Sequence, residues 1–275
     1  MKCLVGCTLL IGFAFATFQA QNSKFVFPKE RSSVNSSALE IVGGDEASPN
    51  QFPYQVALYI EYDLVSAFCG GSLVSSNYVL TAAHCALGAI SFDVILGAHN
   101  ISDNSEPTRQ RSTTSKYVVH PDWNSTSLTN DLALIELETP ITLNDFVSVV
   151  SLAVGNNSFA DSEGTACGWG KTTDSQVGTT DVLRYETSII LSNDDCKNVD
   201  SNYEEEIKNT HLCLAGDGIK SICKGDSGGP LVADNVQVGI TSFSYRSCEA
   251  GKPSVFTRVT EFTQWIQENS DVIFA

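Results

Sequence analysis

A serine followed by two glycines is the residue of this sequence best suited to nucleophilic chemistry. Ser227 lies in segment 223–230, which reads CKGDSGGP. Glycine permits a sharply turned backbone, which exposes the hydroxyl and leaves neighbouring N–H groups accessible. A serine at its ordinary pKa is a poor nucleophile, so this interpretation needs a base and an orienting carboxylate elsewhere in the chain. A plain glycine-rich turn is the alternative, and the segment alone does not decide between them.

The base must come from four histidines: His84, His99, His120 and His211. His84 ends the apolar stretch 80–83 and precedes Cys85, and a second cysteine, Cys69, lies sixteen positions back. A short disulfide loop there would fix the His84 ring. The other three lie in polar, turn-like surroundings, where we expect solvated or structural roles. No two histidines have the spacing of a hairpin or helical zinc site, so we expect no metal.

The orienting carboxylate is expected at Asp131, which heads the apolar stretch 132–135. Burying an unpaired carboxylate costs several kcal/mol, so a half-buried Asp131 needs a partner such as an imidazole. The acidic run Glu204–Glu206 is instead expected to be a solvated loop.

The elements that must position these residues are short apolar stretches separated by Gly, Asn, Asp and Ser, which is typical of an all-β chain with tight turns. Two β units of similar size are the simplest account of them. The stretches are 55–60, 68–74, 79–83, 94–98 and 132–137, then 164–169, 182–191, 230–233, 236–243 and 254–259. Apolar residues from Phe262 to Ile266 then recur at helical spacing, which predicts a closing amphipathic helix that Thr260 could cap.

Composition limits the partners. The chain has 275 residues, 42% apolar and 17% charged, with a net charge of −16. The negative charge argues against nucleic acid or an anionic membrane as a partner.

The first residues predict a secretory signal peptide. One charge, Lys2, precedes an apolar run over 4–15 that is too short for a comfortable membrane span. Small residues place the cleavage after Ala16, with Ala20 as the alternative, so we expect a secreted, extracellular product. A polar segment extends to Glu40, and the composition changes abruptly at Ile41, which predicts a hinge or a processing point.

Cysteines and sequons fit a secreted chain. Of nine cysteines, two leave with the signal peptide, and the remaining seven are an odd number. At least one is therefore free or pairs outside the chain, and the spacing leaves the connectivity open. Sequons for N-glycosylation stand at Asn35, Asn100, Asn124 and Asn156.

Five motifs occur together in a characteristic order: IVGG from position 41, TAAHC from 81, DLAL from 131, GWG from 168 and GDSGGP from 225. With them the chain resembles the chymotrypsin-like (trypsin-type) serine endopeptidase family from residue 41 to about residue 269. The stretches VILGAHN and GITSF are most similar to the arthropod chymotrypsin and brachyurin (serine collagenase) branch. These residues do not indicate whether native collagen is cleaved.

The resemblance implies an all-β protease domain over 41–275. It has two six-stranded antiparallel β-barrels, about 41–150 and about 151–258, with the active site between them and a C-terminal helix at about 260–270. It further implies that Ser227 is the nucleophile, His84 the general base and acid, and Asp131 the carboxylate that holds the imidazole tautomer. The N–H groups of Gly225 and Ser227 would form the oxyanion hole.

The resemblance also assigns the substrate contacts. Ser221 corresponds to the floor of the primary specificity pocket, Ser244 and Ser254 to its walls, and Lys224 to its rim. Because the floor is neutral, we expect cleavage after large or medium apolar residues rather than after Arg or Lys. The backbone of Ser242, Phe243 and Ser244 would pair with an extended substrate, and Ser242 would support Asp131.

Activation is implied in the same way. Cleavage between Glu40 and Ile41, which ends a propeptide over 17–40, would free an amino group that pairs with Asp226, so the full chain should be inactive. Most relatives have Arg or Lys where this chain has Glu40. Cleavage at Arg31 followed by trimming and an activator specific for acidic residues are the two routes left open.

Family disulfides would join Cys69 to Cys85, Cys196 to Cys213 and Cys223 to Cys248, and leave Cys167 buried and unpaired. We expect no cofactor, a monomer, and protein or peptide substrates, an activating protease and proteinaceous inhibitors as partners. The alternative function is a catalytically silent homologue that binds or regulates. The complete set of Ser227, His84 and Asp131 favours the enzyme, and digestive, venom and signalling roles remain open, with a digestive or simple effector role favoured.

Overall fold

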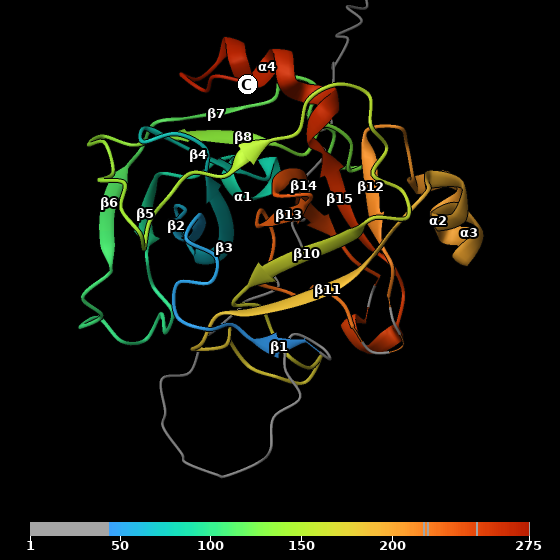
Figure 1. The fold of residues 1–275 in the computed structure, drawn as a ribbon, viewed down its shortest axis with the longest axis horizontal. Helices are drawn as coiled ribbons and strands as arrows, with labels where there is room; N and C mark the ends of the chain where they lie inside the picture. The colour runs from blue at the N-terminus through green and yellow to red at the C-terminus, as the bar shows by residue number, and fades with distance from the viewer. Residues whose placement is uncertain (1–43, 217, 219, 246, 275) are drawn as a thin grey trace, which may run out of the picture. The chain divides into compact units, whose positions relative to one another are not determined.

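The computed structural model describes residues 44–274 apart from 217, 219 and 246. The predicted signal peptide and propeptide, with Glu40 and Ile41, lie outside the described residues. Two curled antiparallel sheets make up most of the described chain (Figure 1). The chain passes from the first sheet to the second between Glu136 and Ser151.

The first sheet closes into a barrel through a bent strand. Its order is β6 (Gln110–Thr114), β5 (Ser91–Leu96), β2 (Gln55–Glu61), β3 (Ser66–Leu73), β4 (Tyr78–Thr81), β8 (Ala133–Glu136) and β7 (Tyr117–Val119). Only two residues separate β6 from β7, so the two ends of the sheet belong to one continuous segment. Thr114 Oγ1 donates to Glu136 O at 2.8 Å and Glu136 N donates to Lys116 O at 3.0 Å, which holds the bend against β8. Counted with this bend, the barrel has six strands, as predicted.

The second sheet is a closed six-stranded barrel. Its order is β11 (Arg184–Leu191), β10 (Glu163–Gly168), β13 (Pro230–Ala233), β14 (Val236–Phe243), β15 (Ser254–Arg258) and β12 (His211–Leu214), and β12 pairs back with β11. Two short strands add to it: β1 (Asp45–Glu46) beside β11, and β9 (Ser151–Leu152) parallel to β14. The all-β, two-barrel prediction is therefore confirmed.

Buried aliphatic and aromatic side chains stabilise each barrel from within. Leu58, Leu80 and Phe92 are fully buried in the first cluster, and Ile190 and Phe256 in the second. Full burial of one such side chain contributes about 1.5–3 kcal/mol.

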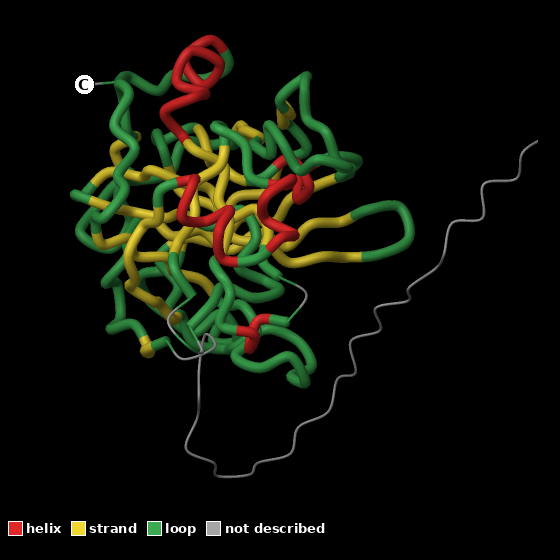
Figure 2. The backbone as a smooth tube through the Cα atoms, turned by 90° about the vertical axis from the view of Figure 1, so that its right-hand side faces the viewer, coloured by secondary structure: helices red, strands yellow, loops and turns green. Residues whose placement is uncertain are grey.

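The helices are short and lie outside the barrels (Figure 2). They are α1 (Ala83–Ala86), α2 (Asn193–Val199), α3 (Ser201–Glu206) and α4 (Thr263–Glu268), with 3₁₀ helices η1 (Cys248–Ala250) and η2 (Val259–Phe262). The predicted loop at Glu204–Glu206 is wrong, since these residues belong to α3. Asp200 begins that helix by accepting the Asn202 N–H at 3.0 Å.

The predicted C-terminal helix is present, but its first turn differs. The chain forms η2 first, and Phe262 precedes α4 without a side-chain cap, so the predicted cap at Thr260 is wrong. The rings of Phe262 and Trp265 lie 5.3 and 5.1 Å from the His120 ring, which attaches this segment beside β7 (Figure 1). His120 therefore has a packing role. None of the helices in the described part of the chain is long and apolar enough to cross a membrane.

Buried polar contacts join the two barrels. Ser72 Oγ of β3 donates to Gln237 Oε1 of β14 at 2.7 Å, and the Gly70 N–H donates to Ser227 O at 2.7 Å. Ser227 and Asp131, from different barrels, both lie at this junction. The fold therefore positions the candidate site where the barrels meet.

Candidate active site

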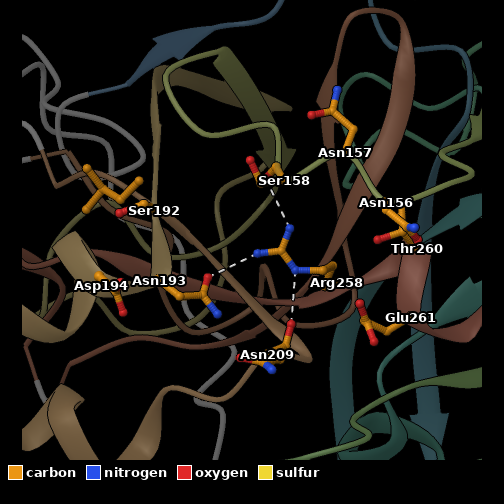
Figure 3. A pocket seen from close by; sticks show the side chains of 11 residues that line it. Asn156, Asn157, Ser158, Ser192, Asn193, Asp194, Asn209, Arg258, Thr260 and Glu261 are labelled. Atoms are coloured by element: carbon orange, nitrogen blue, oxygen red, sulfur yellow. Dashed lines mark hydrogen bonds between the residues drawn. The ribbon is translucent and has the colours of Figure 1, made fainter.

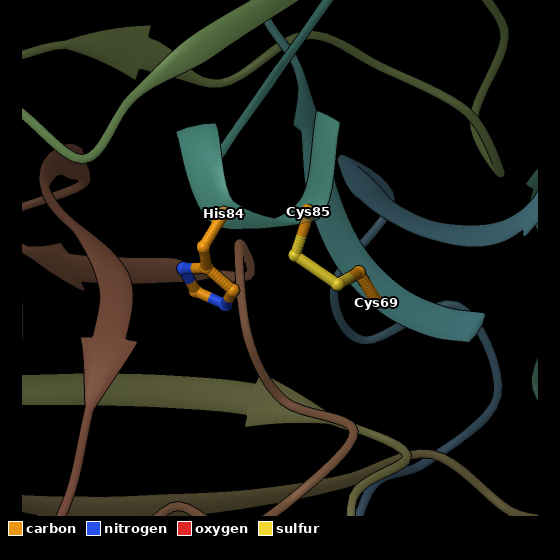
Figure 4. A group of neighbouring side chains, drawn as sticks. All are labelled: Cys69, His84 and Cys85. Atoms are coloured by element: carbon orange, nitrogen blue, oxygen red, sulfur yellow. A yellow bond between two sulfur atoms is a disulfide. The ribbon is translucent and has the colours of Figure 1, made fainter. Parts of the chain in front are cut away.

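His84 is fixed by its neighbours on both sides. It lies on the one-turn helix α1, next to the disulfide between Cys85 and Cys69 (Figure 4). Its ring Nδ1 is 2.7 Å from Asp131 Oδ2, and its backbone N–H donates to Asp131 Oδ1 at 2.9 Å. Because the carboxylate can only accept, Nδ1 carries the hydrogen and Nε2 is the basic nitrogen. The side chain keeps 31% of its surface exposed, so Nε2 can meet a substrate.

Asp131 is fully buried rather than half-buried as predicted, because the second barrel covers it. Ser242 Oγ of β14 donates to its Oδ2 at 2.6 Å, and Thr257 Oγ1 of β15 donates to its backbone oxygen at 2.9 Å. With the two bonds from His84, the carboxylate accepts three hydrogen bonds. These bonds offset the cost of removing the carboxylate from water.

Ser227 is brought to the first barrel by the glycine that follows it. Gly228 has φ = 80°, and a Cβ there would lie 2.6 Å from the Gly70 carbonyl oxygen and would overlap the Thr81 side chain. Thr81 lies three residues before His84. Only glycine therefore lets the Ser227 loop approach the strand that leads to the base. In the described structure Ser227 Oγ and the His84 ring are not hydrogen-bonded to each other.

The amides around Ser227 fall into two groups. The N–H groups of Asp226, Gly228 and Gly229 donate to backbone oxygens at 2.8–3.0 Å. Those of Gly225 and Ser227 donate to no acceptor among the described residues. They are the two amides predicted to form an oxyanion hole, and they are available for that purpose.

Asp226 turns away from the serine and into the second barrel. Its carboxylate accepts the N–H groups of Gly170 at 2.8 Å and Cys223 at 2.9 Å. It lies directly against Gly168 and Gly170, where any Cβ would overlap it. Burial raises its pKa to about 6, and the two N–H donors only partly oppose this effect. Asp226 forms no salt bridge within the described residues.

A second buried carboxyl, Glu186 on β11, was not predicted. It is 2% exposed, and neither carboxyl oxygen has a hydrogen-bond partner among the described residues. Burial, followed by the nearby charge of Asp226, raises its pKa to about 8. The sequence held a signal for it, since alternation within the predicted strand 182–191 puts position 186 on the same face as buried Ile190.

We expect the uncleaved chain to lose stability as the pH rises from about 6.5 to about 8. Glu186 holds its proton more tightly when folded, with a pKa of about 8, than when unfolded, so its contribution is lost as the pH rises through 8. Burial lowers the pKa values of His120 and His211, so these two groups change the stability only below this pH range. Urea unfolding should show a fall of about 1–2 kcal/mol, and Glu186→Gln should abolish it. A flat wild-type profile would contradict this assignment.

The residues predicted for the floor and one wall of the specificity pocket, Ser221 and Ser254, bring two uncharged hydroxyls together. Ser221 and Ser254 are buried, and their hydroxyls are 3.2 Å apart. Ser254 Oγ also accepts the Ile222 N–H at 3.2 Å. The disulfide between Cys223 and Cys248 joins the segments on either side. No acidic side chain takes part in these contacts.

Three further residues predicted to contact the substrate are less buried than Ser221 and Ser254. Phe243 is half-buried with its ring 5.6 Å from that of His211, and Ser244 is half-buried beside it. Lys224 is exposed, and its carbonyl accepts the Lys171 N–H at 2.9 Å.

His211 is neither exposed nor in a turn. It lies on β12 with no exposed surface, accepts the Lys208 N–H at Nδ1 and reaches Leu128 O with Nε2 at 3.0 Å. The prediction of polar, turn-like surroundings was wrong, although a structural role fits. His99 is half-buried, and its carbonyl accepts the Trp169 Nε1–H at 3.1 Å.

The cysteines of the described chain stabilise the fold. Disulfides join Cys69 to Cys85, Cys196 to Cys213 and Cys223 to Cys248, and Cys167 is a buried free thiol that donates to Gln55 Oε1 at 3.1 Å. In the group of Cys69, His84 and Cys85, the two sulfurs are bonded to each other (Figure 4), and the imidazole Nδ1 lies against Asp131. These three atoms are therefore not available as metal ligands.

A cavity beside Arg258 is separate from the predicted site. The guanidinium donates to Asn209 O, Ser158 O and Asn193 Oδ1 at 3.0–3.1 Å (Figure 3). These bonds join two loops, at Ser158 and Asn209, and the first residue of α2, Asn193. None of the predicted catalytic residues lines this cavity.

Two β-barrels define the serine endopeptidase class when a buried Asp paired with a half-buried His and a glycine-supported serine loop lie at their junction. Comparison with known proteins agrees. The sequence model of the family described as Trypsin matches residues 41–266. Brachyurin of Leptuca pugilator is 44% identical over 236 residues, which cover 84% of this chain and 99% of the relative. Chymotrypsin of Phaedon cochleariae is 41% identical over 250 residues, with 90% and 88% covered.

A solved structure described as HL collagenase matches with a TM-score of 0.76 and 34% identity, and the match covers 85% of this chain and all of the other. The chain belongs to the trypsin family and is a chymotrypsin-like serine endopeptidase. The predicted resemblance to the chymotrypsin and brachyurin branch is confirmed.

Proposed function

We propose that this chain is the zymogen of a secreted endopeptidase that cleaves after large or medium apolar residues through an acyl-enzyme. The observation that carries the proposal is the bonded set of His84, Asp131 and Ser242 at the junction that also holds the Ser227 loop.

The first half-reaction forms the acyl-enzyme. Ser227 Oγ attacks the scissile carbonyl carbon while His84 Nε2 takes its proton, and Asp131 stabilises the imidazolium through Nδ1. The negative oxygen that develops is stabilised by the N–H groups of Gly225 and Ser227; loss of one such donor costs about 3 kcal/mol. His84 then gives the proton to the leaving amine, and water repeats the sequence to release the acid.

The neutral side chain at the predicted floor, Ser221, and the neutral wall residue Ser254 beside it support apolar specificity. A Lys or Arg side chain would bring a charge into this pocket without a carboxylate, which is costly. In a panel of chromogenic peptides, the chain starting at Ile41 should cleave after Leu, Phe and Tyr with kcat/KM at least about tenfold higher than after Ala, Arg or Lys.

Ser221→Asp is the matched variant for this panel, since a floor carboxylate should raise cleavage after Lys and Arg. Preferred cleavage after Arg or Lys by the wild type would overturn the specificity proposal. No cleavage of any peptide would instead favour a silent homologue, which no described residue supports.

We propose activation by cleavage between Glu40 and Ile41, after which the new amino group pairs with Asp226. The buried Asp226 carboxylate, with a pKa raised to about 6 and no cation among the described residues, supports this proposal. N-terminal sequencing of the active form should begin at Ile41, and any other start would refute it. An apolar pocket would not accept Glu40, so a separate protease is needed for activation.

Secretion agrees with the three disulfides, since such bonds persist in oxidising compartments. The partners we propose are protein or peptide substrates, the activating protease and protein inhibitors, and the enzyme acts as a monomer. A digestive role is the simplest one for such a protease.

A further inference from the structure

The interior of the second barrel holds two carboxyl groups over the same face of the sheet, Glu186 from β11 and Asp226 from the loop before β13. Asp226 lies against Gly168 of β10, and Gly168 pairs with Arg184 of β11. Glu186 lies two residues further along β11, opposite Ala166. Glu186 is thus diagonal to Gly168, at a spacing of roughly 7–8 Å between backbones, from which a glutamate side chain reaches the Asp226 carboxylate.

No described group satisfies Glu186. The Ile222 N–H lies near enough to lower its pKa, but donates its hydrogen bond to Ser254 Oγ at 3.2 Å. Lys220 also lowers the pKa of Glu186 but forms no salt bridge with it within the described residues.

Among the described residues, the other titratable groups on these two strands form no salt bridge with the pair either. On β10 this group is the buried Cys167 thiol, whose pKa is raised by burial and by Asp226. Arg184, on the strand of Glu186 itself, is 3.9 Å from Glu46. Among the described residues, neither of these two buried carboxyls forms a salt bridge with a cation.

An ammonium group fits this arrangement. Each Asp226 oxygen accepts one backbone N–H, which leaves lone pairs on both, and both Glu186 oxygens are unused. An ammonium group has three donors and one positive charge, so it can bond to both carboxyls at once. A single carboxylate with a neutral neighbour would leave one of these donors without an anionic acceptor.

We propose that Glu186 and Asp226 together bind the ammonium group that cleavage creates at Ile41. The inference rests on the proposed activation and adds a second carboxyl to it. When the ammonium group enters, Glu186 releases its proton to solvent, and two negative charges then hold the ammonium group in its protonated form. Glu186 is a positioning residue, since it acts through the new terminus and Asp226 rather than on the substrate. Because two carboxylates hold the ammonium group, the active conformation persists to a higher pH than one carboxylate alone would allow.

The test measures the active fraction, rather than the rate, as the pH rises. Chains starting at Ile41 are prepared as wild type, Glu186→Gln and Glu186→Leu, with Glu163→Gln as the matched control on an exposed position of β10. Active sites are titrated with a serine-directed reagent from neutral to alkaline pH. We expect the alkaline midpoint to fall by about one pH unit in both Glu186 variants, because a nearby charge shifts a buried pKa by that order. Glu163→Gln should keep the wild-type midpoint.

The outcomes separate this inference from the proposed function. An unchanged midpoint in Glu186→Gln or Glu186→Leu, with normal titration near neutral pH, would overturn the role of Glu186 and leave the protease intact. If the wild type itself cannot be titrated, the proposed function fails. If Glu186→Gln folds poorly, Glu186→Leu decides, since an apolar side chain removes the buried carboxyl without leaving an unpaired polar group.

Discussion

Replacing Ser227 by alanine in the chain that starts at Ile41 is expected to lower kcat by about 10⁶-fold, or about 8 kcal/mol. The bonded pair of His84 and Asp131 activates only the Ser227 hydroxyl. Without this hydroxyl, the remaining rate acceleration comes only from substrate binding and the oxyanion N–H groups. Steady-state hydrolysis of the best apolar peptide measures the effect. KM should change little, because the specificity pocket is untouched.

The groups of the triad should also behave as one unit. His84→Ala should cost about as much as Ser227→Ala, and the double variant should lose little more. Ser175→Ala, at an exposed serine, is the matched control and should keep full activity. A Ser227→Ala enzyme that retains a tenth of the wild-type rate would contradict the nucleophile assignment.

The second large effect is expected at Asp226, which does not touch the substrate. Asp226→Asn in the cleaved chain should lower the active fraction at least about 100-fold, because the buried ammonium group loses the Asp226 carboxylate at a cost of about 3–5 kcal/mol. Asparagine fits the space against Gly168 and Gly170, and its oxygen can still accept one of the two N–H groups. The loss should therefore appear in kcat and in active-site titre, while the variant remains folded.

The control for this variant is Asp234→Asn, an exposed turn residue of the same barrel with φ = 51°. It should match the wild type. Urea unfolding of the uncleaved Asp226→Asn chain should show unchanged or higher stability, since that chain no longer buries a carboxylate. Normal activity of cleaved Asp226→Asn would contradict the proposed activation.

Much of the fold could be predicted because apolar stretches of strand length carry it. The strands at Pro230–Ala233 and Val236–Phe243 have the predicted bounds, and Gln55–Glu61 differs by one residue. By contrast, β6 is polar, reading QRSTT, and forms because neighbouring β5 supplies hydrogen bonds. Its own residues do not signal a strand, since cross-strand pairing rather than local pattern stabilises it.

Long-range contacts explain the errors around the site. Asp131 is fully buried because β14 and β15 of the other barrel cover it, which no local pattern reports. The turn-like surroundings predicted for His211 were wrong, because its ring fills a space between Leu128 and Phe243 that only the fold creates.

Glu186 was missed for a different reason. A buried acid in a strand contradicts the usual apolar pattern, and its partner by our inference, the terminus at Ile41, lies far away in the sequence. Residues that depend on a distant or newly created group are the hardest to predict from local sequence.

The central claim is that cleavage before Ile41 produces an enzyme whose nucleophile is Ser227. Its most direct test is labelling of the cleaved chain with a serine-directed phosphonylating reagent, followed by peptide mapping. The account predicts one label per chain, located on Ser227, together with loss of all peptidase activity and only trace labelling of the uncleaved chain. Absence of label on Ser227 in a folded chain that starts at Ile41 would contradict it.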